Sequence, residues 1–176
     1  EKISDRGVAF GMKTKTIEDL FHETLKDIYY AERKILRALP KMARGAKSPD
    51  LKAAFQKHKD ETEMQVERLQ QVFELIGKPA RGKTCPAIDG ILEEGEEALQ
   101  DFADSPALDA SLIAAAQAVE HYEIARYGTL RRWAEVMGMK DAAKLLDQTL
   151  QEEGMTDESL TQLADGSINQ AALQAA

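Results

Sequence analysis

The sequence predicts an all-α protein, and three observations support that prediction. Ala, Leu, Glu, Gln and Lys are abundant, whereas the 176 residues include only 11 Gly and 5 Pro and lack β-branched runs. Apolar residues recur at spacings of three and four along four long segments. The breaks between these segments contain Gly, Pro or capping residues. We therefore expect four long helices, and a hydrophobic content of 43% is enough to build their core.

The first two helices are predicted over residues 16–43 and 49–76. Between them, "RGAKSPD" supplies a helix-ending Gly, an N-cap Ser and a Pro at the first helical position, namely Gly45, Ser48 and Pro49. Gly77, followed by Pro79, ends the second helix. Because the break is short, these two helices are expected to form an antiparallel hairpin.

A long connection leads to the second pair of helices. Its first part, "KPARGKTCPAIDG", is irregular, and its second part, "GILEEGEEALQDF", is typical of a short acidic helix. Ser105 and Pro106 are expected to open the third long helix, which stops at Gly138, and the fourth spans roughly residues 141–164. Two hairpins joined by a long crossover indicate a ferritin-like antiparallel four-helix bundle with a short extra helix.

The domain is expected to cover residues 12–165, followed by a C-terminal tail over 166–176. Residues 1–11 precede Met12, which resembles a natural start, so we interpret them as an added remnant and exclude them from the fold prediction.

Composition restricts the partners and the compartment. A net charge of −8 and a pI near 5.0 argue against nucleic acid or an anionic membrane as the main partner. No segment resembles a signal peptide and no apolar run reaches about eighteen residues, so we expect a cytoplasmic protein. The single Cys85 cannot form an internal disulfide or a rubredoxin-type module.

Each long helix carries acid on its apolar stripe, near its middle. Glu32 lies between apolar residues on the first helix, and two acids three residues apart interrupt the stripe of the third. The second helix turns polar at a His and a Glu one turn apart, and the fourth has a Glu in its apolar series. The candidate metal ligands are Glu32, His58, Glu61, Glu120, Glu123 and Glu153.

The spacing of the acids suggests an internal pseudo-repeat. Glu32 and Glu61 are 29 residues apart, and Glu123 and Glu153 are 30 apart, so the two hairpins nearly overlay. Four buried carboxylates would cost at least several kcal/mol and repel one another. Two divalent cations would cancel their four charges. Carboxylates with an imidazole suit iron or manganese, and such a pair of ions can exchange electrons with oxygen or peroxide.

A solvated helix face or a salt-bridged core would also account for these acids, and both possibilities stay open. Against the salt-bridged core, the nearby bases Arg33, Lys34 and Arg126 lie off the acidic stripes. His22 and His121 receive no role. Four tyrosines flank the acids and serve in packing, as hydrogen-bond donors to ligands or as radical carriers, with packing favoured: Tyr29, Tyr30, Tyr122 and Tyr127.

Three segments, "HKDET", "QAVEHYEIARYGTL" and "LLDQTLQEE", resemble the YciE/YciF family of bacterial ferritin-like proteins, and the similarity extends over residues 12–165. The resemblance implies a ferritin-like bundle, a homodimer, a di-metal carboxylate centre and an association with stress responses. In the broader rubrerythrin-like pattern four core carboxylates match, and Glu120 resembles an additional one on the third helix. The four are Glu32, Glu61, Glu123 and Glu153.

The sequence also departs from that broader pattern. Where the pattern has a His three residues after Glu, this chain has Met64 and Thr156, and its candidate His58 precedes Glu61 instead. The main hypothesis is a di-iron or di-manganese protein that acts on peroxide or oxygen, or oxidises ferrous iron, with an external electron donor. Peroxidase, catalase-like and ferroxidase activities all stay open. The alternative is a dimeric scaffold protein whose metal is structural or vestigial.

Overall fold

The computed structural model describes residues 13–175, and these residues are almost entirely helical, with no strand among them. Five helices of 16 residues or more follow one another in the chain, which confirms the predicted all-α class. They are α1 (Ile17–Gly45), α2 (Pro49–Leu75), α3 (Pro86–Asp101), α4 (Leu108–Val136) and α5 (Lys140–Leu163). The chain continues through a π-helical turn, η1 (Ala164–Ile168), into α6 (Asn169–Gln174). The predicted tail over 166–176 is therefore helical through most of its length.

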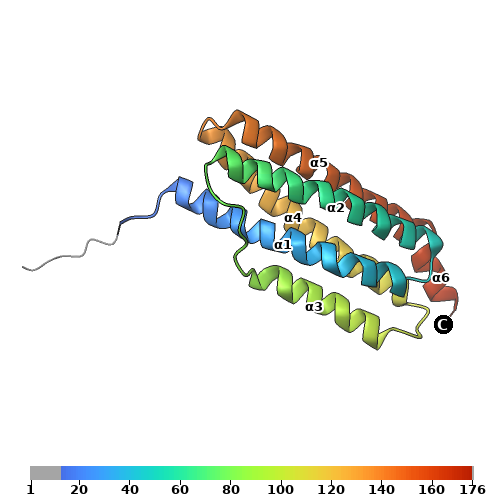
Figure 1. The fold of residues 1–176 in the computed structure, drawn as a ribbon. Helices are drawn as coiled ribbons and strands as arrows, with labels where there is room; N and C mark the ends of the chain where they lie inside the picture. Colours follow the sequence, from blue (N-terminus) through green and yellow to red (C-terminus); the bar gives the residue numbers. More distant parts are fainter. Residues whose placement is uncertain (1–12, 176) are drawn as a thin grey trace, which may run out of the picture.

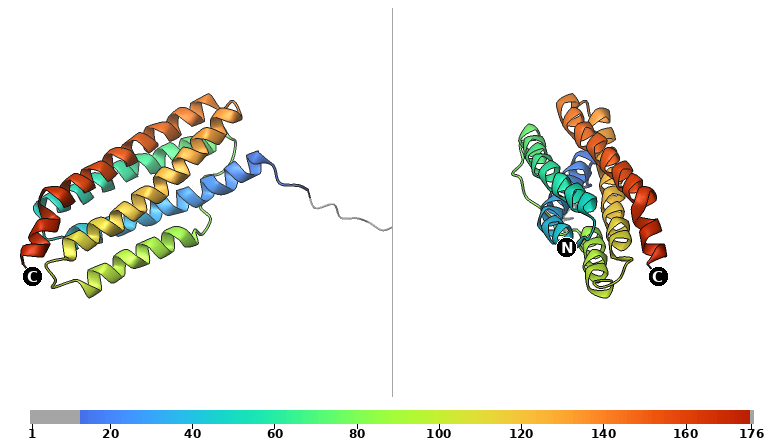
Figure 2. Two further views of the ribbon diagram at one scale, coloured as in Figure 1. Left: turned by 180° about the vertical axis from the view of Figure 1, so that it is seen from behind. Right: turned by 90° about the vertical axis from the view of Figure 1, so that its right-hand side faces the viewer.

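The four longest helices lie side by side, and α3 covers one side of them (Figures 1 and 2). α1 packs on α2 and α4, while α5 packs on α2 and α4 from the other side. α3 contacts α1 and α4. The core between these helices is made of their apolar stripes, with buried residues such as Leu25, Phe55, Leu112 and Leu146.

The ends of the first hairpin follow the capping residues in the sequence. Thr16 and Asp19 form a capping box at the start of α1. Ser48 caps α2 by accepting a hydrogen bond from the backbone N–H of Leu51. After α2, Gly77 has a φ of 66°, which a residue with a side chain rarely adopts. The predicted break between α1 and α2 is confirmed.

The turn between α1 and α2 is bonded to the second hairpin. The carboxylate of Asp109, on the first turn of α4, accepts hydrogen bonds from the backbone N–H groups of Lys47 and Ser48, both at 2.7 Å. Asp109 is only 9% exposed. One side chain of α4 thus satisfies two donors of a turn about 60 residues earlier in the chain.

The start of α4 differs from the prediction. α4 begins at Leu108, and the Ser105 side chain accepts a hydrogen bond from the backbone N–H of Ala107 instead of capping the helix. A short turn, in which the N–H of Leu108 donates to the carbonyl of Ser105, comes first. Ser and Pro stabilise such a turn as well as a helix start, so the same dipeptide signal is compatible with both.

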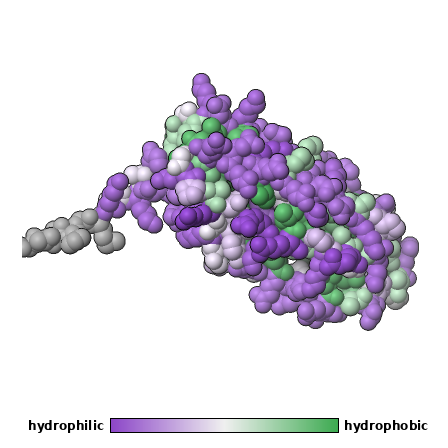
Figure 3. Space-filling view, viewed as in Figure 1, coloured by the Kyte–Doolittle hydropathy of each residue, from purple (hydrophilic) through white to green (hydrophobic). Residues whose placement is uncertain are grey.

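The surface bears mostly polar side chains. In the face shown in Figure 3, hydrophilic residues predominate and the hydrophobic ones form small separate areas. Within residues 13–175 the helices are all too short or too polar to cross a lipid bilayer.

Candidate metal centre

Three glutamates from three helices lie in the middle of the core. Glu32 of α1, Glu123 of α4 and Glu153 of α5 are all fully buried. Each follows the apolar stripe of its own helix, so the packing that buries the stripe also buries the acid. The sequence predicted that these three side chains face inward, and the structure agrees.

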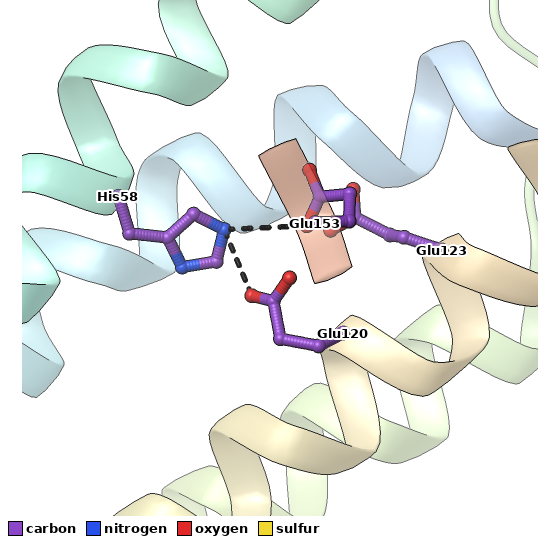
Figure 4. Close-up of side chains that lie close together, drawn as sticks. All are labelled: His58, Glu120, Glu123 and Glu153. Atoms are coloured by element: carbon purple, nitrogen blue, oxygen red, sulfur yellow. Dashed lines mark ion pairs between the residues drawn. The ribbon is translucent and has the colours of Figure 1, made fainter. Parts of the chain in front are cut away.

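His58 of α2 and Glu120 of α4 extend this group along the core. The Nε2 atom of His58 lies 2.9 Å from Oε1 of Glu120 and 3.9 Å from Oε2 of Glu153 (Figure 4). His58 is 3% exposed and Glu120 is fully buried. Four side chains each offer one ligand atom within 4.8 Å of all the others: His58, Glu120, Glu123 and Glu153. We call these four residues the histidine cluster.

The polar atoms of this cluster lack hydrogen-bond partners. When ionised, both carboxylate oxygens of Glu120, Glu123 and Glu153 have no hydrogen-bond donor, and Nε2 of His58 approaches Glu120 without the geometry of a hydrogen bond. Buried polar groups are nearly always satisfied, and exceptions call for a physical cause such as an ion. Oxygen-rich ligation with one imidazole matches the donors that iron and manganese accept. The residues therefore fit a divalent metal.

Burial and mutual repulsion raise the pKa of the four buried glutamates. Burial, followed by the charge of Glu153, raises the pKa of Glu32 from 4.5 to about 8. Burial raises the pKa of Glu120 to about 8 as well. For Glu123 and Glu153, burial is again the main cause, and the neighbouring glutamates raise the pKa further. Without a cation these acids hold protons near neutral pH.

Glu32 lies beyond the histidine cluster and has its own partner. The hydroxyl of Tyr127 donates a hydrogen bond of 2.6 Å to Oε1 of Glu32, and both side chains are fully buried. Oε2 of Glu32 has no partner. Of the four tyrosines near the acids, Tyr127 donates directly to a candidate ligand, which was one of the roles that the sequence left open for them.

The structure places Glu61 at the edge of the core and outside the histidine cluster. Its side chain is 19% exposed, 3.5 Å from the ammonium of Lys57, and accepts a hydrogen bond from Thr156. The adjacent Thr62 is fully buried and occupies the inward position. Successive residues of a helix are about 100° apart, so a difference of one residue moves a side chain from the core to its border.

The alignment of the two hairpins shows that Glu61 is one residue away from the position equivalent to Glu153. α4 begins 91 residues after α1, and α5 begins 91 residues after α2, with no shift between them. At this spacing Glu153 aligns with Thr62, whereas Glu61 aligns with Glu152. The separations of 29 and 30 residues between the predicted acids differ by this one position. Four carboxylates are still buried, namely Glu32, Glu120, Glu123 and Glu153, and Glu61 is not among them.

Sequence reasoning did not assign a role to a polar group at the side of the cluster. Gln65 of α2 is 1% exposed and donates to Glu152, while its Oε1 atom has no partner. Arg68 binds Glu152 with two N–H groups, at 2.5 and 2.7 Å. Gln65 lies on the same stripe as His58, at spacings of four and three through Thr62, so helical periodicity alone could have identified it.

The remaining histidines lie outside the cluster. His121 is mostly exposed and its Nε2 lies 3.2 Å from Asp157. Burial lowers the pKa of His22, which contacts Phe73 edge to face. Cys85 is buried with its sulfur 3.0 Å from the hydroxyl of Tyr122. Neither these two histidines nor Cys85 belongs to the histidine cluster.

Comparisons with known proteins agree on one family. Residues 16–173 match the family model described as "Domain of unknown function (DUF892)". The chain is 46% identical to Protein YciF of Escherichia coli strain K12 over 162 residues, which are 92% of this chain and 98% of that protein. These matches confirm the resemblance noted in the sequence.

Solved structures show the same arrangement. The crystal structure of the E. coli stress protein YciF is 46% identical, with a TM-score of 0.84 over 89% of this chain and 99% of that one. YcfI of Rhodopseudomonas palustris, described as a putative structural protein, is 47% identical, with a TM-score of 0.82 over 86% of this chain and 97% of that one. A Xanthomonas campestris protein, 22% identical with a TM-score of 0.71 over 90% and 97% of the two chains, shares the fold.

Proposed function

This chain belongs to the DUF892 family, which includes YciF, and from that premise we propose that it is a ferritin-like, two-metal carboxylate protein. The observation that supports the proposal most directly is the set of unpartnered oxygens on three buried glutamates beside an unpartnered imidazole nitrogen. Four buried carboxylates, Glu32 included, carry four negative charges when ionised. Two divalent cations, iron or manganese, would balance them.

The ligands divide into two unequal groups under this proposal. The histidine cluster would hold one ion, because its four ligand atoms lie within 4.8 Å of one another. Glu32, with Glu123 and Glu153 shared between the two ions, would hold the second. His58 lies against Glu120, so the second ion would have only oxygen ligands, among which the unpartnered Oε1 of Gln65 is a further candidate. We therefore expect the ion beside Glu32 to bind more weakly than the ion beside His58.

Iron or manganese bound here would supply one-electron chemistry toward oxygen or peroxide. The protein's own contribution is to hold the carboxylates in a dry core and to place a hydroxyl donor, Tyr127, on Glu32. Metal binding must displace the protons that Glu32 and Glu120 retain near neutral pH. An electron donor would have to be external, because the single Cys85 cannot ligate an iron–sulfur or rubredoxin-type centre by itself.

A binding experiment tests the metal centre. Apo-protein is titrated anaerobically with Fe²⁺ or Mn²⁺, and the number of bound ions is counted after gel filtration. We expect two ions in the parent, and loss of tight binding in Glu153→Gln. Glu158→Gln is the matched control, since Glu158 lies on the same helix and is exposed. Equal binding by both variants would contradict the assignment of Glu153.

A second experiment separates an enzyme from a scaffold. Oxygen or hydrogen peroxide is added to the iron-loaded protein, and absorbance and peroxide loss are followed. Turnover supports a ferroxidase or peroxidase, in keeping with the stress-protein description of YciF. An inert centre supports a dimeric scaffold with a structural metal, in keeping with the structural-protein description of YcfI. Light scattering tests the proposed homodimer.

A further inference from the structure

A small cavity lies between α2 and α5, next to the histidine cluster. Its volume is about 40 Å³, and His58 and Glu61 of α2 line it together with Thr156 and Ser159 of α5. A cavity of more than about 10–15 Å³ can hold a water molecule when polar groups line it. His58, which is buried and whose Nε2 has no hydrogen-bond partner, is one of its lining residues. The cavity therefore connects the border of the core with a candidate ligand.

Glu61 is held loosely at the outer side of this cavity. Its Oε1 lies 3.5 Å from Nζ of Lys57, whose side chain is 75% exposed, and its Oε2 accepts a hydrogen bond of 3.2 Å from Thr156. An ion pair this exposed contributes only about 0–1 kcal/mol. An incoming cation can displace the ammonium of Lys57 at little cost, and Glu61 then offers it a carboxylate.

Further along α2, one to two turns after Glu61, the contact between α2 and α5 is closed to cations. There Arg68 of α2 binds Glu152 of α5 with two hydrogen bonds, and Gln65 donates to the same carboxylate. The Arg68 side chain is 11% exposed and always charged, so it repels an approaching metal ion. Of these two levels, the level of Glu61 thus combines a weakly held anion with a cavity that His58 also lines.

Building on the proposed metal centre, we propose that this cavity is the entrance for divalent cations and that Glu61 is their first, transient ligand. Glu61 would exchange Lys57 for the cation and replace part of its water, and Nε2 of His58 and Oε1 of Glu120, which lie 2.9 Å from each other, would then bind it. Oxygen ligands suit the stepwise dehydration that such ions require. Glu61 thereby acts on the rate of loading, whereas the histidine cluster determines the affinity.

Stopped-flow loading of the full apo-protein with Co²⁺, followed with a metal-binding indicator dye, tests the entrance. We expect Glu61→Gln to slow loading and release alike by about tenfold, the lower range of electrostatic steering effects. Lys57→Gln is expected to accelerate loading. Glu63→Gln is the matched control, because Glu63 is paired with Lys59 one turn earlier on α2 in the same way, but is 53% exposed and lines no part of this cavity.

Equilibrium titration of the same variants separates the entrance from the centre. Unchanged affinity with slow loading in Glu61→Gln supports the entrance. Loading as fast as in the parent, or a large loss of affinity that marks Glu61 as a resident ligand, would overturn the entrance and leave the metal centre standing. A parent protein that retains no Co²⁺ at equilibrium would overturn the centre and the entrance together. Lys57→Gln keeps the test valid if Glu61→Gln folds poorly.

Discussion

The two hairpins, α1–α2 and α4–α5, are alike in length and register but unequal in what they place in the core. α1 and α4 both have 29 residues, and each helix of the second hairpin begins 91 residues after its counterpart. Glu32 and Glu123 align and are both buried. At the other acidic positions the hairpins differ, because Glu153 aligns with Thr62, and Glu120 aligns with Tyr29.

This difference shows how a repeated scaffold can build an unsymmetrical centre. The second hairpin provides three of the four buried carboxylates and the first provides one, together with His58. His58 in turn aligns with the buried Thr149, so the imidazole also has no counterpart. Every exchange keeps the position buried and changes only its chemistry. The apolar stripes preserve the fold while the polar positions between them diverge.

The largest expected effect is the loss of unfolding free energy in the metal-free protein as the pH rises. Glu32 and Glu120 have a pKa of about 8 in the folded chain, against an ordinary value of 4.5. The folded state binds these protons more tightly, so the stability they give is complete below pH 4.5 and is lost as the pH rises through 8. At about 1.4 kcal/mol per pKa unit, the unfolding free energy should fall by several kcal/mol.

Urea denaturation in the presence of a chelator, at about pH 5 and about pH 8, measures this loss. The metal-loaded protein should show the reverse trend, because bound cations favour the ionised acids. Glu120→Gln should flatten the apo profile. If the metal-free protein were equally stable at both pH values, the buried acids would ionise as readily in the folded chain as in the unfolded one, and their pKa would not be raised.

The second prediction removes one difference between the hairpins. Thr62→Glu gives α2 the carboxylate that α5 has at Glu153, and adds a fifth acid to the core. We expect the metal-free protein to lose about 3 kcal/mol of unfolding free energy at about pH 8, the cost of an uncompensated buried charge. Thr62→Gln, which adds similar volume without the charge, is the control. Equal losses in the two variants would assign the effect to packing.

The third prediction concerns Tyr127, which aligns with Leu36. Tyr127→Phe removes the hydroxyl that donates to the buried Glu32, and should cost about 1–2 kcal/mol of unfolding free energy. Tyr30→Phe is a matched control, because its hydroxyl bonds the more exposed Asp89 of α3. Thermal denaturation of both variants measures the difference. A larger effect of Tyr30→Phe would argue against a special role for the buried pair.

The smallest effect is expected at Tyr29, the counterpart of Glu120. Its hydroxyl accepts a hydrogen bond of 3.3 Å from Gln70, so Tyr29→Phe should cost about 0.5–1 kcal/mol. The number of metal ions bound should not change, whereas Glu120→Gln should reduce it. Metal counting on the two variants checks this, and a loss of metal in Tyr29→Phe would show that the hairpins share the centre more evenly than proposed.

Much of the helical arrangement could be predicted from local signals. Ser48 and Gly77 sit at helix ends because capping and positive φ are local requirements, and the sequence displays them directly. The inward direction of Glu123 and Glu153 was likewise predictable, because both are in phase with neighbouring apolar residues. Whether these acids bind metal stays a prediction.

Further features depend on contacts that the sequence does not display. Glu61 was expected among the buried carboxylates because the spacings of the acids in the two hairpins differ by only one residue. On a helix, however, a shift of one residue rotates a side chain by about 100°. The docking of α3 on α1 and α4 depends on long-range contacts such as the hydrogen bond from Tyr30 to Asp89. Helical periodicity indicates that α3 has an apolar face but not which helices cover it.

The bond between Asp109 and the turn at Lys47 and Ser48 has a consequence for how the chain folds. During synthesis the first hairpin emerges about 60 residues before the side chain that completes its turn. Until α4 docks, the two backbone N–H groups have only water as a partner, so the first hairpin lacks part of its own stability. Folding is thereby made cooperative across the repeat, and neither half is expected to mature alone.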